Sequence, residues 1–181
     1  MKRFILTGAP GAGKTVVLRE LERDGFSVVE EAATDVIALA RGRGVNQPEG
    51  SSGFIDDIVR LQNQRLARSS AWPDALQFHD RSAVCTAALA AFLGYPVSDE
   101  LERALARIAA EATYQQDVFF IQNLGFIENT AARRINFKDT LRFEAVHLDL
   151  YRRLGYRLVV IAPGPPSERA ATIKALATAI V

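Results

Sequence analysis

The chain has 181 residues, of which 49% are hydrophobic and 24% charged, and its formal net charge is +1. A chain of this length can bury an ordinary core without disulfides or a structural metal, and its balanced charge gives no general attraction to nucleic acid or to an anionic membrane. The single cysteine, Cys85, and the two histidines exclude a disulfide framework and a four-ligand zinc site made of Cys and His.

No segment has the length and apolar character of a membrane span. The longest weakly polar run, Ala83–Leu93, falls short of the ~20 residues that a bilayer requires. The apolar start Phe4–Leu6 stops at Thr7 and Gly8, too early for an export signal. We therefore expect a cytoplasmic protein with no membrane or nucleic-acid partner.

The first thirty residues predict one βαβ unit. Phe4–Leu6 has the continuous apolar character of a buried parallel strand, and Lys14–Arg23 consists of strong helix formers. Phe26–Val29 reads as a second short strand that runs into Glu30 and Glu31. Strand, helix and strand in this order form a right-handed crossover between parallel strands.

The residues that join the first strand to the first helix match the pattern G-x-x-x-x-G-K-[ST]. They are Gly8, Ala9, Pro10, Gly11, Ala12, Gly13, Lys14 and Thr15. Glycines allow successive backbone N–H groups to converge on phosphate oxygens, and the helix that begins at Lys14 directs its positive end at the same anion. We expect Lys14 to contact the β and γ phosphates of ATP and the Thr15 hydroxyl to bind Mg²⁺. A Gly-rich turn can also close an ordinary βα junction, but such a turn has no need of the Lys-Thr pair.

The rest of the chain continues the alternation of strands and helices. Helices are expected at 35–40, 54–69, 86–93, 99–113, 140–154 and from 167 onward, and strands at 75–78, 118–121 and 157–161. The Gly-rich stretch Arg41–Gly53 is expected to be mobile and able to close over an acceptor. Five short strands without a repeat or linker predict one α/β domain over residues 1–181. The Ala-rich helices could pack internally or across a homodimer.

Charged residues follow several of the predicted strands. Asp80 and Arg81 come after the third strand, and ligands of open α/β sheets bind at the carboxyl ends of strands. Asp80 is therefore predicted to hold Mg²⁺, although an Asp at this point can also be only the N-cap of the next helix. Arg81 could contact phosphate or substrate, or lie alone on the surface. His79 is expected to be a packed, hydrogen-bonded histidine.

Two further groups complete the predicted site. Glu30 or Glu31 could accept or orient the proton of an acceptor hydroxyl. Strand alternation lets only one of the two point inward, and the alternation does not decide which. Arg133 and Arg134 lie between the fourth strand and the next helix, where they could close over the nucleotide as a lid or simply face solvent.

These motifs resemble one family. The set is Gly8–Thr15, Val28–Ala33, the strand that ends at His79–Ser82, and Val118–Ile121 followed by an Arg-bearing loop. It resembles the small bacterial AAA-type ATPase and kinase family, which is related to ribosylnicotinamide kinase and more loosely to deoxynucleoside and thymidylate kinases. The resemblance implies a P-loop kinase fold, a three-layer sandwich with a five-stranded parallel sheet of order 2-3-1-4-5.

The resemblance also implies roles for single residues. In deoxynucleoside kinases a Glu after the second strand acts as base, and an acidic-Arg-Ser triplet follows the third strand. Glu30 or Glu31 and Asp80–Ser82 occupy those positions here. Asp80 stands where that triplet has Glu, so the resemblance does not establish a nucleoside kinase.

Two functions fit these residues. The favoured one is an ATP-dependent phosphotransferase that acts on a hydroxyl of a nucleoside-like small molecule. The alternative is a regulatory ATPase or nucleotide-dependent binding protein without such an acceptor. A ring-forming motor is disfavoured because Asp80 is followed by Arg81 rather than by Glu, and no Asn-Lys-x-Asp run indicates guanine specificity. No motif identifies the acceptor.

Overall fold

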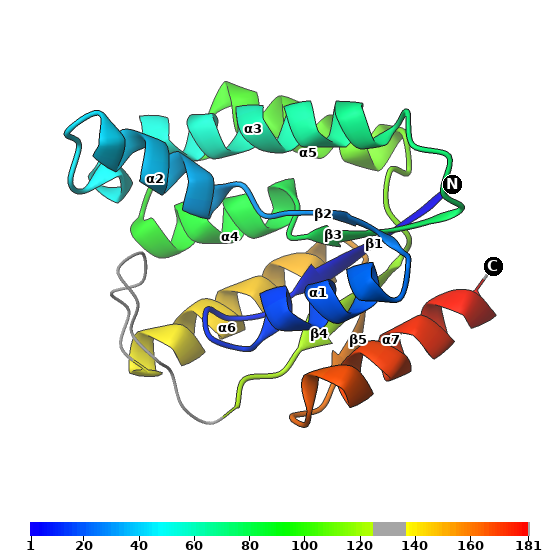
Figure 1. Ribbon diagram of the computed structural model, residues 1–181. Coiled ribbons are helices and arrows are strands. Elements are labelled where there is room, and N and C mark those ends of the chain that lie inside the picture. Colours follow the sequence, from blue (N-terminus) through cyan, green and yellow to red (C-terminus); the bar gives the residue numbers. More distant parts are fainter. Residues whose placement is uncertain (125–136, 181) are drawn as a thin grey trace.

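A single parallel sheet organises the protein. The computed structural model describes residues 1–124 and 137–180 and arranges five strands in the order β2-β3-β1-β4-β5 (Figure 1). The strands are β1 (Lys2–Thr7), β2 (Ser27–Val29), β3 (Leu76–Asp80), β4 (Asp117–Ile121) and β5 (Arg157–Ile161). Every neighbouring pair is parallel. The predicted α/β fold and its strand order are therefore confirmed.

Helices cover both faces of this sheet. They are α1 (Lys14–Arg23), α2 (Ala33–Gly42), the 3₁₀ helix η1 (Pro48–Gly50), α3 (Gly53–Ser69), α4 (Ala83–Leu93), α5 (Asp99–Ala110), α6 (Phe137–Arg153) and α7 (Pro166–Ala179). α1 and α7 pack together on one face, while α3, α4, α5 and α6 lie on the other (Figure 1). The result is three layers, with the sheet in the middle.

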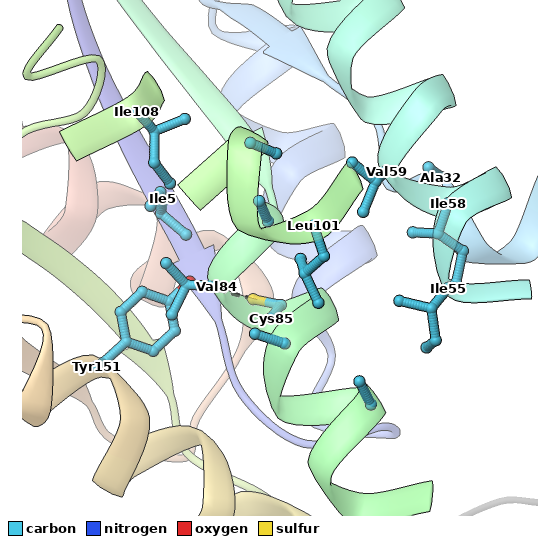
Figure 2. Close-up of a cluster of buried hydrophobic side chains, with 14 of the residues drawn as sticks. Ile5, Ala32, Ile55, Ile58, Val59, Val84, Cys85, Leu101, Ile108 and Tyr151 are labelled. Carbon is cyan, nitrogen blue, oxygen red and sulfur yellow. Dashed lines mark hydrogen bonds between the residues drawn. The ribbon is translucent and has the colours of Figure 1, made fainter. Parts of the chain in front are cut away.

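The central strand β1 shows why the sheet is buried on both sides. Phe4 and Leu6 point into the cluster under α1 and α7, whereas Ile5 points into the cluster under α4 and α6. In that second cluster Val84 and Cys85 of α4 lie near Ile5 and Tyr151 (Figure 2). Alternate residues of a strand face opposite sides, so the part of a strand that is covered on both faces is mostly apolar.

Several elements differ in length from the sequence prediction. β3 continues to Asp80 because His79 and Asp80 pair with Ile5 and Leu6 of β1, so Asp80 is the last residue of the strand rather than the first after it. α5 ends at Ala110, before a turn in which Ala112 has a φ of 45°. α6 begins at Phe137, three residues earlier than expected.

Within residues 1–124 and 137–180, no helix combines the length and apolar character needed to cross a membrane. His79 is packed, as expected: its ring lies edge-on to Tyr114, and its Nε2 lies 3.4 Å from Gln77 Oε1. The assignment of residues 1–181 to one domain and the suggestion of a homodimer stay predictions.

Candidate functional site

The loop after β1 has the backbone of an anion cradle. Gly8, Gly11 and Gly13 have φ values of 135°, 83° and 84°, a region that favours glycine. A Cβ at Gly8 would lie 2.4 Å from the Ile121 carbonyl oxygen, so only glycine lets the loop pass the end of β4. Gly13 is the N-cap of α1 and has no side chain to satisfy the first N–H groups. Those groups are available to an anion.

Lys14 lies inside this loop. Its side chain is only 7% exposed, and its Nζ donates hydrogen bonds to the carbonyl oxygens of Gly8 at 3.0 Å and Ala9 at 2.8 Å. Burial, helped by the neighbouring Arg81 guanidinium, lowers the pKa of Lys14 to about 7. A bound polyphosphate would favour the ammonium form and accept these hydrogen bonds in place of the carbonyls.

Asp80 and Thr15 line one small cavity of about 220 Å³. Asp80 is 5% exposed, and its Oδ1 is buried without a hydrogen-bond partner among the described residues. Burial raises the pKa of Asp80, while Lys14 and Arg81 partly oppose that shift. A buried carboxylate oxygen with no partner is unfavourable unless a ligand reaches it.

These two residues fit a Mg²⁺ ion that is held together with a nucleotide. Mg²⁺ in phosphoryl-transfer sites usually takes one or two protein oxygens and completes its shell with water and phosphate oxygens. Within the described part of the chain, no cluster of three or more Asp, Glu, His or Cys side chains could bind a metal without such help. Asp80 and Thr15 could supply protein oxygens to such an ion, and the carboxylates of Glu30, Glu31 and Asp35 line the same cavity.

The turn after β2 separates the two adjacent glutamates. Glu30 is 53% exposed and pairs with Arg19 of α1, on the outside of the molecule. Glu31 is 23% exposed, and its Oε2 lies 3.3 Å from Arg81 Nε. Burial raises the pKa of Glu31, but Arg81, hydrogen bonds from Thr34 and the charge of Lys14 outweigh it, so the net shift is downward. Glu31 is therefore the glutamate that contacts Arg81, and its lowered pKa keeps it ionised at neutral pH.

Arg81 joins Glu31 to α6. Its Nη1 lies 3.3 Å from His147 Nε2, and His147 Nδ1 lies 2.9 Å from the Phe143 carbonyl oxygen. Since a guanidinium only donates, His147 must accept at Nε2 and donate from Nδ1. Burial and the charge of Arg81 lower the pKa of His147 to about 3, in agreement with this neutral tautomer. No sequence motif pointed to His147, which lies 66 residues from Arg81.

Arg81 also has an uncommon backbone. Its φ is 72°, and its N–H donates to the Leu6 carbonyl oxygen of β1 at 3.0 Å. A non-glycine residue in this region costs roughly 1 kcal/mol or more, a cost often found where a side chain must be aimed at a site. The next residue, Ser82, is the N-cap of α4. The capping function that could have belonged to Asp80 is thus performed by Ser82, which leaves Asp80 free to face the cavity.

A larger cavity of about 470 Å³ adjoins the loop. Pro10 of the loop, Glu31 and Arg81 form part of its lining, and Glu49, Gln62 and Thr86 contribute further polar groups. The rest is largely apolar and comes from α2, α3, α4 and α6: Ile37, Phe54, Ile58, Leu89, Phe92 and Phe143. The volume falls within the range of small-molecule sites. Glu31 lines this cavity as well as the smaller one beside Asp80.

Arg169 of α7 supports the loop from the opposite side. It is 4% exposed and donates to the Ala12 carbonyl oxygen at 2.8 Å and to the Gln122 carbonyl oxygen, after β4, at 2.7 Å. One side chain therefore connects the phosphate loop, the end of β4 and α7. The sequence carries no local signal for this role, because the two bonded segments lie 157 and 47 residues away.

The predicted arginine lid and the choice between the two glutamates remain to be placed. Arg133 and Arg134 lie outside the described residues, so their predicted lid role stays a prediction. Of the two glutamates only Glu31 lies near Arg81 and the large cavity, although both line the small one. The roles predicted for the other candidate residues also stay predictions.

Comparisons with known proteins agree with this geometry. A family model described as an AAA domain matches residues 3–169. The solved structure of NadR protein in complex with NAD and AMP-PNP superposes with a TM-score of 0.68 at 15% identity, over 98% of this chain and 49% of that one. This chain thus spans about half the length of NadR.

A second solved structure, shikimate kinase from Acinetobacter baumannii in complex with shikimate, has a TM-score of 0.58 at 16% identity, over 99% of this chain and 94% of that one. At such identities the likeness establishes the fold alone. A comparison with the sequences of curated proteins gives no match.

Proposed function

The chain belongs to the AAA-domain family and has a kinase-like P-loop nucleotide-binding fold, and from that premise we propose that it transfers the γ-phosphoryl group of ATP to a hydroxyl of a nucleoside-like acceptor. The loop Gly8–Thr15 binds the triphosphate through its N–H groups and Lys14. Asp80 and Thr15 hold Mg²⁺, which offsets the phosphate charge when it is bound. The acceptor occupies the 470 Å³ cavity.

One observation carries this proposal: the side chain of Glu31 lines both cavities. A carboxylate in that position borders the space for an acceptor on one side and the Asp80–Thr15 edge on the other. Arg81, held by His147, restricts the orientation of Glu31. A regulatory nucleotide switch needs a phosphate loop, but it has no need of an apolar cavity bordered by an oriented carboxylate.

The reaction follows from these positions. The acceptor hydroxyl oxygen forms a bond to the γ-phosphorus, while the bond from that phosphorus to the bridging oxygen of ADP breaks. Glu31 orients the hydroxyl and accepts its proton, which then passes to solvent. Lys14 and the loop N–H groups stabilise the charge on the transferred group and on the leaving ADP.

A labelled-phosphate assay tests the proposal. Purified protein with Mg²⁺ and ATP labelled in the γ position is incubated with a panel of nucleosides and sugars, and products are separated by chromatography. We expect labelled phosphate on at least one nucleoside, and none with Lys14→Ala. Release of free phosphate alone, together with an ATP-dependent change in assembly state on gel filtration, would overturn the kinase assignment in favour of a regulatory ATPase.

A further inference from the structure

One carboxylate of the large cavity has no function in the reaction proposed above. Glu49 belongs to η1, and its Oε2 is shut off from solvent while accepting no hydrogen bond from the described residues. The segment that carries it is held in place, because the Tyr95 hydroxyl donates to the Glu49 carbonyl oxygen at 2.8 Å. An acceptor atom enclosed in this way is unfavourable unless a donor reaches it.

The surroundings of Glu49 restrict what that donor can be. Phe54, Phe92 and Phe143 supply aromatic surface to the same cavity, which suits a flat ring. The guanidinium of Arg81 is engaged by Glu31 and His147. The carboxylates of Glu31, Glu49 and Asp139 line the cavity together with the guanidinium groups of Arg41 and Arg81, so the wall has no excess of positive charge to attract an acidic occupant.

Gln62 adds a second polar contact to the wall. Its Oε1 accepts from the Thr86 hydroxyl at 3.0 Å, which turns its amide nitrogen away from that bond. Gln62 and Glu49 therefore place an amide and a carboxylate in the wall of a largely apolar space. This arrangement suits a heterocycle with ring nitrogens that accept hydrogen bonds and an N–H group that donates one.

We propose that Glu49 is a specificity-determining residue, which selects acceptors whose heterocyclic ring bears an amino group, as in adenosine and cytidine. This inference rests on the proposed function. It places the ring of the acceptor in the large cavity and the hydroxyl of the acceptor beside Glu31. The amino group donates to Glu49 Oε2 and satisfies the buried carboxylate oxygen. An acceptor without that group leaves the oxygen unpaired, and such sites discriminate strongly.

Matched pairs of nucleosides test the inference. Adenosine is compared with purine riboside, and cytidine with the analogue in which hydrogen replaces the 4-amino group, so only the donor is lost. For the wild-type protein we expect kcat/KM to be about 10- to 100-fold higher for the amino-bearing member of at least one pair. Calorimetry with the same nucleosides and a non-hydrolysable ATP analogue should show the same order of affinity.

Variants then assign the preference to Glu49. Glu49→Leu should reduce the ratio within that pair to less than threefold, and Glu49→Gln, which keeps the shape, should reduce it part of the way. Glu111→Gln is the matched control, because Glu111 is exposed and lines neither cavity, and it should keep the wild-type ratio. Thermal unfolding shows which variants are folded.

The outcomes separate the two proposals. Phosphoryl transfer that is equal for both members of each pair, or a preference that Glu49→Gln and Glu49→Leu both leave intact, overturns the role of Glu49 while the kinase stands. An absence of transfer to every nucleoside, with or without an amino group, overturns both.

Discussion

The protonation state of Lys14 depends on whether phosphate is bound beside it. In the free protein burial favours its neutral form, with a pKa of about 7, well below the ordinary value of 10.5. A bound triphosphate favours the ammonium. Between these two pKa values, binding of the nucleotide must therefore take up a proton.

This difference predicts a pH-dependent affinity. Above pH 7 the free protein increasingly carries neutral Lys14, so the affinity for MgATP should fall as pH rises, by up to about tenfold per pH unit. Calorimetry at pH 8 in two buffers of different ionisation enthalpy measures the proton uptake. Lys14→Ala should bind weakly and take up no proton at this step. Wild-type binding at pH 8 without proton uptake would contradict the prediction.

Glu30 and Glu31 form a natural matched pair. Both are glutamates of one turn, but only Glu31 contacts Arg81 and lines the large cavity. Glu31→Gln should lower kcat by about 10²- to 10⁴-fold, because the acceptor hydroxyl loses the carboxylate that takes its proton. Glu30→Gln removes an exposed pair with Arg19 but leaves Arg81 and the wall of the large cavity unchanged, so kcat should stay within threefold of wild type.

Steady-state kinetics on the acceptor identified by the labelled-phosphate assay, with ATP affinity measured separately, check this pair. ATP affinity should change little in either variant. A larger loss of kcat in Glu30→Gln than in Glu31→Gln would show that the assignment of the two carboxylates is reversed.

At the scale of elements, α7 is more than a cover for the sheet. Its Arg169 donates to carbonyl oxygens of the phosphate loop and of the segment after β4. Removing the guanidinium would leave the buried Ala12 carbonyl without this donor, which costs about 1–3 kcal/mol, and would also remove the donor to the part-buried Gln122 carbonyl. The loop that should close around the phosphates would then be less well defined.

We therefore expect Arg169→Met to weaken ATP binding about tenfold or more, and Arg169→Lys to recover part of the loss. Lys174→Met on the same helix is the control, since Lys174 forms an exposed ion pair with Asp24 and does not touch the loop. Binding is measured by calorimetry below the unfolding temperature of each variant. Wild-type affinity in a folded Arg169→Met protein would contradict a positioning role.

At the scale of the whole molecule, two neutral histidines make folding sensitive to acid. Burial and a nearby arginine lower the pKa of His79 and of His147 to about 3 each. The unfolded chain binds these protons near pH 6.5, so the unfolded state binds more protons than the folded state between about pH 6.5 and 3. Stability must therefore fall as pH falls through that range.

When the pH falls from 6.5 to 5, each histidine should lower the free energy of unfolding by about 2 kcal/mol. Urea denaturation at pH 6.5 and 5 measures the change, and the double variant His79→Gln, His147→Gln should lose much of it. Carboxylates titrate mostly below this range, so they are a minor contribution. An equal decrease in the wild-type protein and the double variant would assign the acid sensitivity to other groups.

The parts of the fold and site that the sequence predicts are those encoded locally. Gly8–Thr15 specifies the phosphate loop within eight consecutive residues, because its glycines, Lys14 and Thr15 act on one ligand through neighbouring backbone atoms. Apolar runs such as Val118–Ile121 predict the buried strands, because most positions of a strand covered on both faces are apolar. The strand order followed from the resemblance and is confirmed.

The parts that only the tertiary structure decided depend on groups far apart in the chain. Strand alternation allowed either glutamate to face inward, and the contact with Arg81 selects Glu31. The contacts of Arg81 with His147, and of Arg169 with Ala12, join residues 66 and 157 positions apart. Glu49 looks like any polar residue of a Gly-rich stretch until η1 places it on the wall of a cavity. Such roles arise from burial and from the partners that folding brings near, and no local pattern of residues contains either.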